Sequence, residues 1–197
     1  MGAKIRLVAR RCVTTLAAAT LSVTAPLPQY ASADPPPGFP NLLLFAPVPA
    51  EGYFVHLQAG SSRLLNFSTP DNVVCSFYAG EDLVPGQSQG INCDGTMPGM
   101  INAPFSGGGG GRLHPGECVL GAVRSAGPAY RLERNTYGDC DGRPPKLPNT
   151  GKLLETGQKV SYQNVTCAVG VEHLLACLDT TSGEHGFVLQ PAGSTAF

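Results

Sequence analysis

The amino-acid sequence predicts a mostly β protein: a single antiparallel sandwich or barrel-like domain, stapled by three disulfides and ending in a three-stranded meander. Gly (25) and Pro (18) together make up about a fifth of the 197 residues, which is high for a helical protein and suits short strands joined by turns. Six cysteines follow residue 33. Outside the first segment, no stretch has sustained helical periodicity.

Residues 1–33 have the organisation of a signal peptide. Four basic residues precede an apolar run from Cys12 to Ala25, and Ala31-Ser32-Ala33 is a small-residue segment of the kind that signal peptidases cleave. The apolar run is shorter than the roughly 20 residues that cross a bilayer as a helix. We therefore expect a chain that is exported, cleaved before residue 34, and secreted or retained in the cell envelope, with no stable membrane insertion after cleavage.

The chain after this leader is mildly acidic and long enough for one domain. It contains nine Lys or Arg and fourteen Asp or Glu, a formal net charge of −5. Such a balance does not attract phosphate backbones, so we expect no nucleic-acid partner. About 164 residues suffice for one hydrophobic core. We predict a signal peptide (1–33), a Pro-rich N-terminal segment (34–50) and a disulfide-stapled β domain (51–197), with no cofactor.

The Pro-rich segment cannot be helical and is predicted to run extended. Within it, Leu42 to Phe45 are apolar enough to pack on the core. Three runs rich in β-branched and aromatic residues come next, separated by turn-like sequences, and their short spacing favours antiparallel pairing. These predicted strands are Tyr53–Gln58, Arg63–Ser68 and Val73–Tyr78.

The middle of the chain has a weaker pattern. Residues 79–116 offer only short apolar islands and are predicted to be irregular, and they include the pentaglycine 107–111, which is typical of a loop. Strands are predicted again at Glu117–Ala122 and Ala129–Glu133, before a turn-rich linker, Gly138–Pro148.

The C-terminal region has the clearest strand pattern. Three runs are separated by four-residue connections that have the length and chemistry of hairpin turns. A single sheet face can bury the resulting three-stranded meander. Its predicted strands are Lys159–Val169, Leu174–Thr180 and His185–Gln190.

Six cysteines after the leader predict three disulfides, because an even number in an exported chain normally pairs: Cys75, Cys93, Cys118, Cys140, Cys167 and Cys177. The alternative, a metal site, requires closer spacing such as C-x-x-C, which no pair has. Fifteen connectivities are possible. If a hairpin turns at residues 171–173, Cys167 lies opposite Cys177 at a distance that suits a disulfide. Cys75 with Cys93, and Cys118 with Cys140, follow only as sequential neighbours.

Two segments match a known sequence pattern. The first is Phe67-Ser-Thr-Pro-Asp-Asn-Val-Val-Cys75, followed by Cys93, and the second runs from Val165 to Phe197 and contains V-T-C, A-C-L-D and S-G-E-H-G-F-V-L. In these segments the chain resembles an exported actinobacterial, largely mycobacterial, group of small proteins of uncharacterised function. The resemblance covers roughly half of the mature chain. It implies an extracytoplasmic β domain with local disulfides, and it implies no reaction.

One short segment could support catalysis. Ser182, Glu184 and His185 place a hydroxyl, a carboxylate and an imidazole close together, and Asp179 lies just before them. A hydrolase site is conceivable with these groups. The same residues also make an ordinary hairpin turn, and a triad needs members from separate elements together with an oxyanion hole. We therefore favour a structural role for this segment.

Other polar residues favour structural roles as well. His56 is predicted to lie within a strand and His173 in a turn. Asp94, Asp139 and Asp141 flank cysteines and offer oxygen ligands to calcium, but they are far from a full set of six to eight. We expect these carboxylates to lie in solvated turns.

Three hypotheses about function remain open. The first is an exported, non-enzymatic domain that binds a component of the cell envelope or of a host, with loops such as 79–116 presented for recognition. The second is a secreted protein that resembles a protease inhibitor, since disulfides can preorganise exposed loops. The third is a small hydrolase that uses His185.

Overall fold

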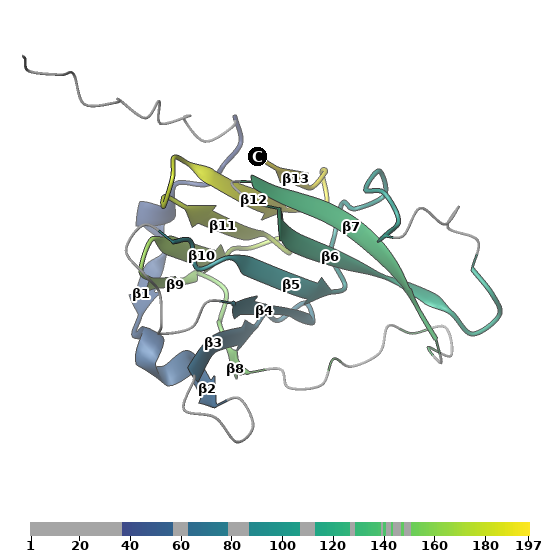
Figure 1. Ribbon diagram of the computed structural model, residues 1–197, viewed down its shortest axis with the longest axis horizontal. Coiled ribbons are helices and arrows are strands. Elements are labelled where there is room, and N and C mark those ends of the chain that lie inside the picture. The colour runs from purple at the N-terminus through teal and green to yellow at the C-terminus, as the bar shows by residue number, and fades with distance from the viewer. Residues whose placement is uncertain are drawn as a thin grey trace, which may run out of the picture.

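The computed structural model describes residues 37–56, 63–78, 87–106, 113–126, 129–138, 140, 143, 147 and 151–197. The predicted signal peptide and the pentaglycine lie outside the described residues. Two β-sheets pack face to face (Figure 1), and each ends in edge strands and does not close on itself. The molecule is thus a sandwich and not a barrel, which confirms the predicted mostly β fold class.

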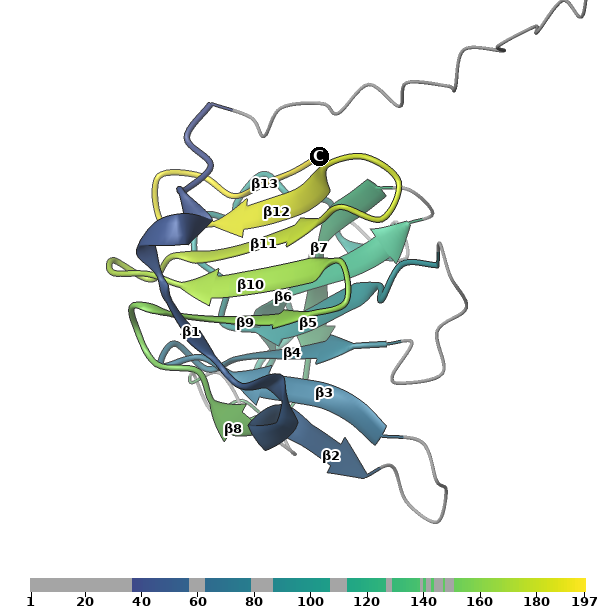
Figure 2. The ribbon, with the colours of Figure 1, turned by 90° about the vertical axis from the view of Figure 1, so that its left-hand side faces the viewer.

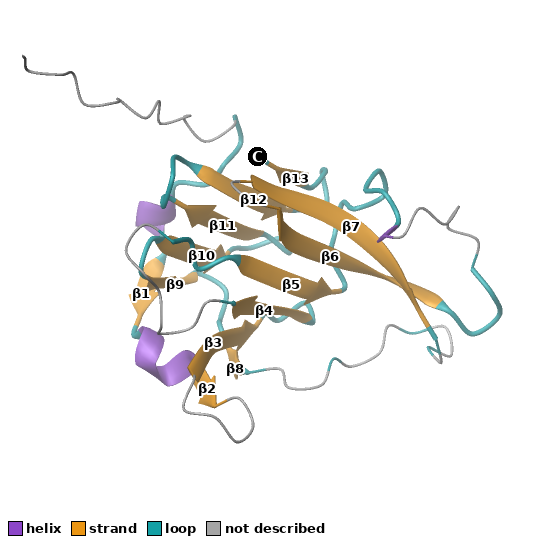
Figure 3. Cartoon of the chain, viewed as in Figure 1, coloured by secondary structure: helices purple, strands orange, loops and turns teal. Residues whose placement is uncertain are grey.

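Strands account for most of the described elements, and two short 3-10 helices precede the first long strand (Figure 3). In the described part of the chain, no helix has the length and apolar character to cross a membrane. The elements are η1 (Leu42–Leu44), β1 (Ala46–Val48), η2 (Ala50–Tyr53), β2 (Phe54–His56), β3 (Arg63–Ser68), β4 (Val73–Phe77), β5 (Ile91–Gly95), β6 (Cys118–Ala126), β7 (Ala129–Tyr137), β8 (Lys152–Leu153), β9 (Gln158–Tyr162), β10 (Val165–Val169), β11 (Leu175–Asp179), β12 (His185–Leu189) and β13 (Thr195–Ala196).

The five C-terminal strands, together with β1, form a six-stranded sheet in the order β1-β9-β10-β11-β12-β13 (Figure 2). Its centre is the predicted meander, with β10, β11 and β12 paired antiparallel. The prediction of one strand over 159–169 is wrong, because β9 and β10 are two strands of a hairpin in which Tyr162 pairs with Val165. Gln163 turns the chain at a φ of +54°. Without a Gly there, the sequence carries little signal for a two-residue turn.

The other sheet has the order β2-β3-β4-β5-β6-β7, and β8 pairs with β3 in parallel. Strand β3 has the predicted bounds, and β4 stops one residue short of its prediction. Residues 79–116 are not wholly irregular, because β5 lies within them. The two strands predicted at 117–122 and 129–133 are longer than expected, since β6 and β7 pair over nine residues each.

One hydrophobic core fills the space between the sheets, and both sheets contribute to it. In β4 and β5, side chains alternate between the core and the solvent with the period of two that a strand imposes. In β4, Val73, Cys75 and Phe77 are buried while the residues between them are partly exposed. The rings of Tyr130, from β7, and Phe187, from β12, meet edge to face at 5.7 Å and join the two sheets.

Three disulfides hold the sandwich, and all three pairings agree with the prediction. The β4–β5 disulfide joins Cys75 to Cys93, and the β10–β11 disulfide joins Cys167 to Cys177. Each links residues directly opposite on neighbouring strands, with a Cα–Cα distance of 4.1 Å, and all four side chains are fully buried in the core. The third, the rim disulfide, joins the first residue of β6 to Cys140 beyond the end of β7.

The Pro-rich segment contributes an edge strand to the six-stranded sheet. Within it, β1 pairs with β9 in parallel at the edge of the six-stranded sheet, where a proline in the strand is tolerated. The prediction that Leu42–Phe45 pack on the core is wrong, because none of these residues is buried or belongs to the core cluster. Leu43 and Leu44 are 84% and 82% exposed, while the residues on either side of them are half-buried. The Lys159 ammonium donates to the carbonyl oxygen of Leu42 at 2.7 Å.

Candidate functional site

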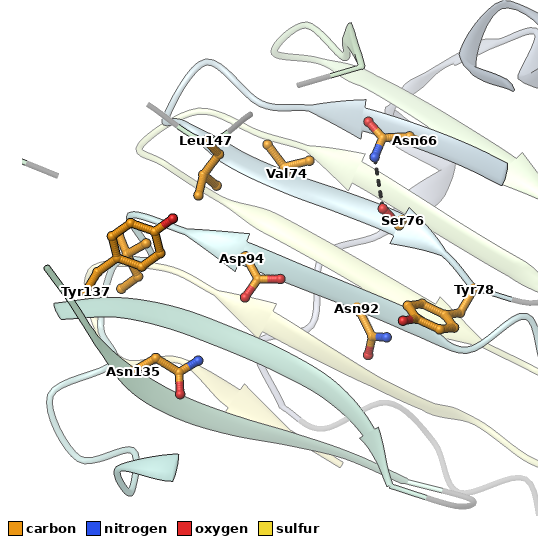
Figure 4. A pocket seen from close by; sticks show the side chains of 10 residues that line it. Asn66, Val74, Ser76, Tyr78, Asn92, Asp94, Asn135, Tyr137 and Leu147 are labelled. Atoms are coloured by element: carbon orange, nitrogen blue, oxygen red, sulfur yellow. Dashed lines mark hydrogen bonds between the residues drawn. The ribbon is translucent and has the colours of Figure 1, made fainter. Parts of the chain in front are cut away.

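A trough on the solvent-facing side of the seven-stranded sheet is the strongest candidate for a binding site (Figure 4). Its volume of about 470 Å³ lies within the usual range of ligand pockets, about 300–1,000 Å³. We call it the outer trough. Its lining residues are Asn66, Val74, Ser76, Tyr78, Asn92, Asp94, Leu120, Asn135, Tyr137 and Leu147.

Strand alternation brings these side chains to one face. Because Val73, Cys75 and Phe77 point into the core, Val74 and Ser76 point outward. Strand β5 repeats the pattern, with Asn92 and Asp94 outward between buried neighbours. Of these positions, only Asp94 had been considered from the sequence, as a calcium ligand, and none had been predicted to line a binding site. The available signal was the regular alternation of polar with buried residues over β4 and β5, which shows an outward polar face but does not reveal which strands lie beside it.

Hydrogen bonds organise one wall of the trough. The Asn66 amide nitrogen donates to the Ser76 hydroxyl oxygen at 2.9 Å. The Asn66 side-chain oxygen is buried and has no hydrogen-bond partner among the described residues. Since Ser76 accepts from Asn66, its own hydroxyl hydrogen remains available to a ligand. This wall therefore presents a donor beside a buried acceptor.

The charge at the centre of the trough is balanced. Asp94, the lining carboxylate, accepts from both terminal nitrogens of Arg124, at 2.6 and 3.1 Å. Such a bidentate ion pair fixes the relative orientation of the carboxylate and the guanidinium. One nitrogen of Arg124 also donates to the carbonyl oxygens of Cys93 and Val123, so the guanidinium is anchored to the sheet.

Two tyrosines mark the ends of the trough. Tyr78 is 70% exposed and Tyr137 is 45% exposed, and the close-up shows them at opposite ends with Asp94 between them (Figure 4). Leu147 lies beside Tyr137 in the same view. The rim disulfide is anchored close to this end, because Cys118 pairs with Tyr137 across β6 and β7.

The predicted hydrolase residues do not assemble into a triad. The His185 ring donates from Nε2 to the backbone carbonyl of Ser182 at 3.2 Å, because a carbonyl can only accept. Asp179 is buried and is held by other groups: it accepts from the Tyr130 hydroxyl at 3.0 Å and from the Thr181 hydroxyl and amide at 2.6 and 2.9 Å. Ser88 also hydrogen-bonds to Asp179. Asp179 thus fastens the 87–90 segment and β7 to β11.

Burial of this polar cluster affects Tyr130. Desolvation, followed by the negative charge of Asp179 and the hydrogen bond to it, raises the pKa of Tyr130 well above its ordinary value. The phenol therefore stays neutral and donates to the carboxylate throughout the physiological range.

The two other histidines that the sequence singled out do not line the trough. His56 is exposed on β2, and His173 pairs with Asp71, which connects the β10–β11 turn to the β3–β4 turn. His173 takes a positive φ of +62° in that turn. Asp94 was expected in a solvated turn but lies on β5, paired with Arg124, because β5 was not predicted. Asp139 and Asp141 lie outside the described residues. The described residues contain no cluster of His, Cys, Asp and Glu suited to a metal ion.

Comparison of the chain with protein-family models, curated proteins and solved structures gives no match. The resemblance to exported actinobacterial proteins therefore stays a prediction. Function has to be argued from the outer trough itself.

Proposed function

We propose that this chain is an exported, non-enzymatic binding protein that holds a component of the cell envelope or of a host in the outer trough. The observation that carries the proposal is a hollow of about 470 Å³ on a rigid sheet face, lined by amide, hydroxyl and aromatic side chains. A few oriented polar groups around a concave surface are the usual composition of a ligand site.

The chemistry of the lining favours binding over catalysis. Nucleophilic catalysis requires a nucleophile within hydrogen-bond reach of a base. Among the described lining residues, the hydroxyl of Ser76 contacts an amide, and the carboxylate of Asp94 is engaged by Arg124. Neither group is placed to activate the other. The trough can therefore hold and orient a ligand, and its residues have no evident means of cleaving it.

Export is supported by the redox state. Three disulfides indicate an oxidising environment, as found outside the cytoplasm. Two of them each link neighbouring strands within one sheet, and the rim disulfide links the start of β6 to the chain beyond β7, near Tyr137. A sheet held in this way presents its side chains with little reorganisation, which favours affinity.

The proposal is tested by filling the trough. The processed protein, immobilised, is incubated with solubilised envelope material and with host extracellular matrix, and the retained material is quantified. Ser76→Gln places a longer side chain on the trough floor. Thr166→Gln is the matched control. Like Ser76, Thr166 lies half-buried on a central strand, and its hydroxyl makes a hydrogen bond, with the Ser161 hydroxyl at 2.8 Å. Thr166 belongs to the other sheet and does not line the trough.

We expect saturable capture by the unmodified protein and by the Thr166 variant, and loss of capture, by about tenfold or more in affinity, for the Ser76 variant. Circular dichroism confirms that both variants are folded. Equal capture by the two variants, or no saturable capture by the unmodified protein, would show that the trough is not a binding site.

A further inference from the structure

We infer that the ligand of the outer trough is an uncharged polyhydroxylated chain, a segment of a neutral oligosaccharide or polysaccharide that packs on Tyr78 and Tyr137 at the two ends. This inference rests on the proposed function, because it assigns a ligand class to the same site. Three properties of the trough lead to it: its charge, its hydrogen-bonding groups and its shape.

The charge of the face excludes strongly ionic ligands. Asp94 is neutralised by Arg124, and on the neighbouring strand the side chain of Arg131 pairs with Glu133 at 2.7 Å. By the register of β6 and β7, these charged residues share the outward face with Asn135. The described part of this face therefore has no surplus charge to attract a phosphate or a polyanion, and a neutral ligand loses less hydration on entering it.

The hydrogen-bonding groups are of the kind that sugar hydroxyls complement. An amide presents donors and an acceptor side by side, and a hydroxyl does both with one atom. Asn92 uses its side-chain oxygen to accept from the Ser125 amide at 3.3 Å, which leaves its two amide hydrogens to a ligand. Asn135 and Ser76 add further amide and hydroxyl groups. Vicinal sugar hydroxyls, which donate and accept in turn, fit this alternation.

The position of the trough argues against an extended peptide. A peptide strand usually binds at a sheet edge, where backbone groups are unpaired. The outer trough instead lies across β3 to β7, whose backbone groups are already engaged in the ladders between strands. Only side chains are available to a ligand there. A ligand whose own polar groups are hydroxyls can hydrogen-bond to both the donors and the acceptors among these side chains.

The two tyrosines add a stacking surface at each end. The face of a sugar ring that carries C–H groups packs on an aromatic ring, while the phenol oxygen stays in water. Both tyrosines are well exposed and lie on the same polar face. Leu147 and Val74 add apolar surface toward the Tyr137 end of the trough (Figure 4).

The spacing of the tyrosines indicates a chain of several rings. Residues 75, 93, 123 and 132 lie in one row across β4 to β7. Tyr78 is three residues beyond this row and Tyr137 five beyond it in the opposite direction, because β4 and β7 run antiparallel. At strand dimensions, the Cα atoms of the two tyrosines are separated by about 26 Å along the strands and about 14 Å across them. One ring cannot contact both ends.

The inference is tested with a glycan array that contains neutral and acidic saccharides, followed by calorimetric titration of neutral glucan, mannan and chitin-type oligosaccharides from monosaccharide to hexasaccharide. We expect affinity to increase with chain length and to stay unchanged, within about twofold, between low and high salt, because a neutral ligand releases no counterions. Tyr78→Ala and Tyr137→Ala should each weaken binding about tenfold. Ile101→Ala, which removes an exposed apolar side chain outside the trough, should have no effect.

Each outcome separates the two claims. Binding restricted to acidic glycans, a steep salt dependence, or unchanged affinity in both tyrosine variants would overturn the saccharide assignment. If the array is blank while Ser76→Gln still abolishes capture of envelope or host material, the ligand belongs to another class and the trough remains a binding site. If neither experiment depends on the trough, both proposals fail.

Discussion

Removing the disulfides one at a time should reveal whether loop length or core packing sets their contribution to stability. In the chain-entropy description, bridges that span 10, 18 and 22 residues stabilise the fold by about 2.7, 3.2 and 3.4 kcal/mol at 25 °C. The three loops do not overlap in the chain, so these contributions add to about 9 kcal/mol. That sum is comparable to the whole stability of a typical domain, about 5–15 kcal/mol.

Core packing reverses the order of stabilisation that loop length predicts for the three disulfides. The β4–β5 and β10–β11 disulfides are fully buried in the core, whereas the rim disulfide does not belong to the core cluster. Replacing a buried pair with two alanines leaves a cavity and adds a cost of about 2 kcal/mol. We therefore expect the free energy of unfolding to fall by about 5 kcal/mol when the β4–β5 or the β10–β11 disulfide is removed alone. Removal of the rim disulfide alone should lower it by about 3 kcal/mol.

Urea denaturation of the three double-alanine variants measures these losses, once intact mass has confirmed the two remaining bridges. A double-valine variant of the β10–β11 pair refills the cavity without restoring the bridge, and it should recover about 1–2 kcal/mol relative to double alanine. If the rim variant proved the least stable of the three, loop length would dominate and the packing argument would be wrong.

Two further predictions concern particular side chains. Tyr130→Phe should cost about 1–2 kcal/mol at pH 7, because the buried carboxylate of Asp179 loses a donor. The pKa of Tyr130 is raised in the folded state, so above about pH 10 only the phenol of the unfolded chain ionises. The stability of the unmodified protein should therefore fall as the pH rises above that value. In urea titrations, the Phe variant should show a shallower fall. Gly95→Ala should cost about 2–4 kcal/mol, since Gly95 has a φ of +148° and an added Cβ would lie 2.2 Å from the Asn72 carbonyl oxygen. Gly138→Ala, with open space around it, should stay within about 0.5 kcal/mol. Thermal denaturation of both glycine variants measures the two losses, and a similar loss at both would contradict the steric argument.

Sequence reasoning succeeded where a strand carries its own signal. Arg63–Ser68 has the predicted bounds because its short run of apolar and aromatic residues lies between turn-like sequences. It failed at β5, in which Asn, Asp and Gly have low strand propensity. That strand is ordered by pairing with a strand on each side and by the disulfide to Cys75. These stabilising partners are distant in the chain and invisible to a local pattern.

The candidate site was missed for a related reason. Ser76, Asn92 and Asn135 each look like an ordinary outward-facing polar residue in the sequence, and none carries a motif. They form one trough only because β4, β5, β6 and β7 lie side by side. The residues of the hydrolase hypothesis show the opposite case, since Asp179 and His185 pair across β11 and β12 but hydrogen-bond to different partners.

Three properties follow from the sequence alone: the strand-rich composition, the alternation along the predicted runs, and a cysteine count sufficient for three bridges. The composition and the cysteine count depend only on residue type, and the alternation depends on a period of two. Beyond the C-terminal meander, tertiary structure alone decided which strands became neighbours, and therefore which outward side chains share a face. The physical reason is that the entropy cost of closing a loop grows only slowly with its length, so a strand pairs with the segment that best buries its apolar face, however far along the chain that segment lies.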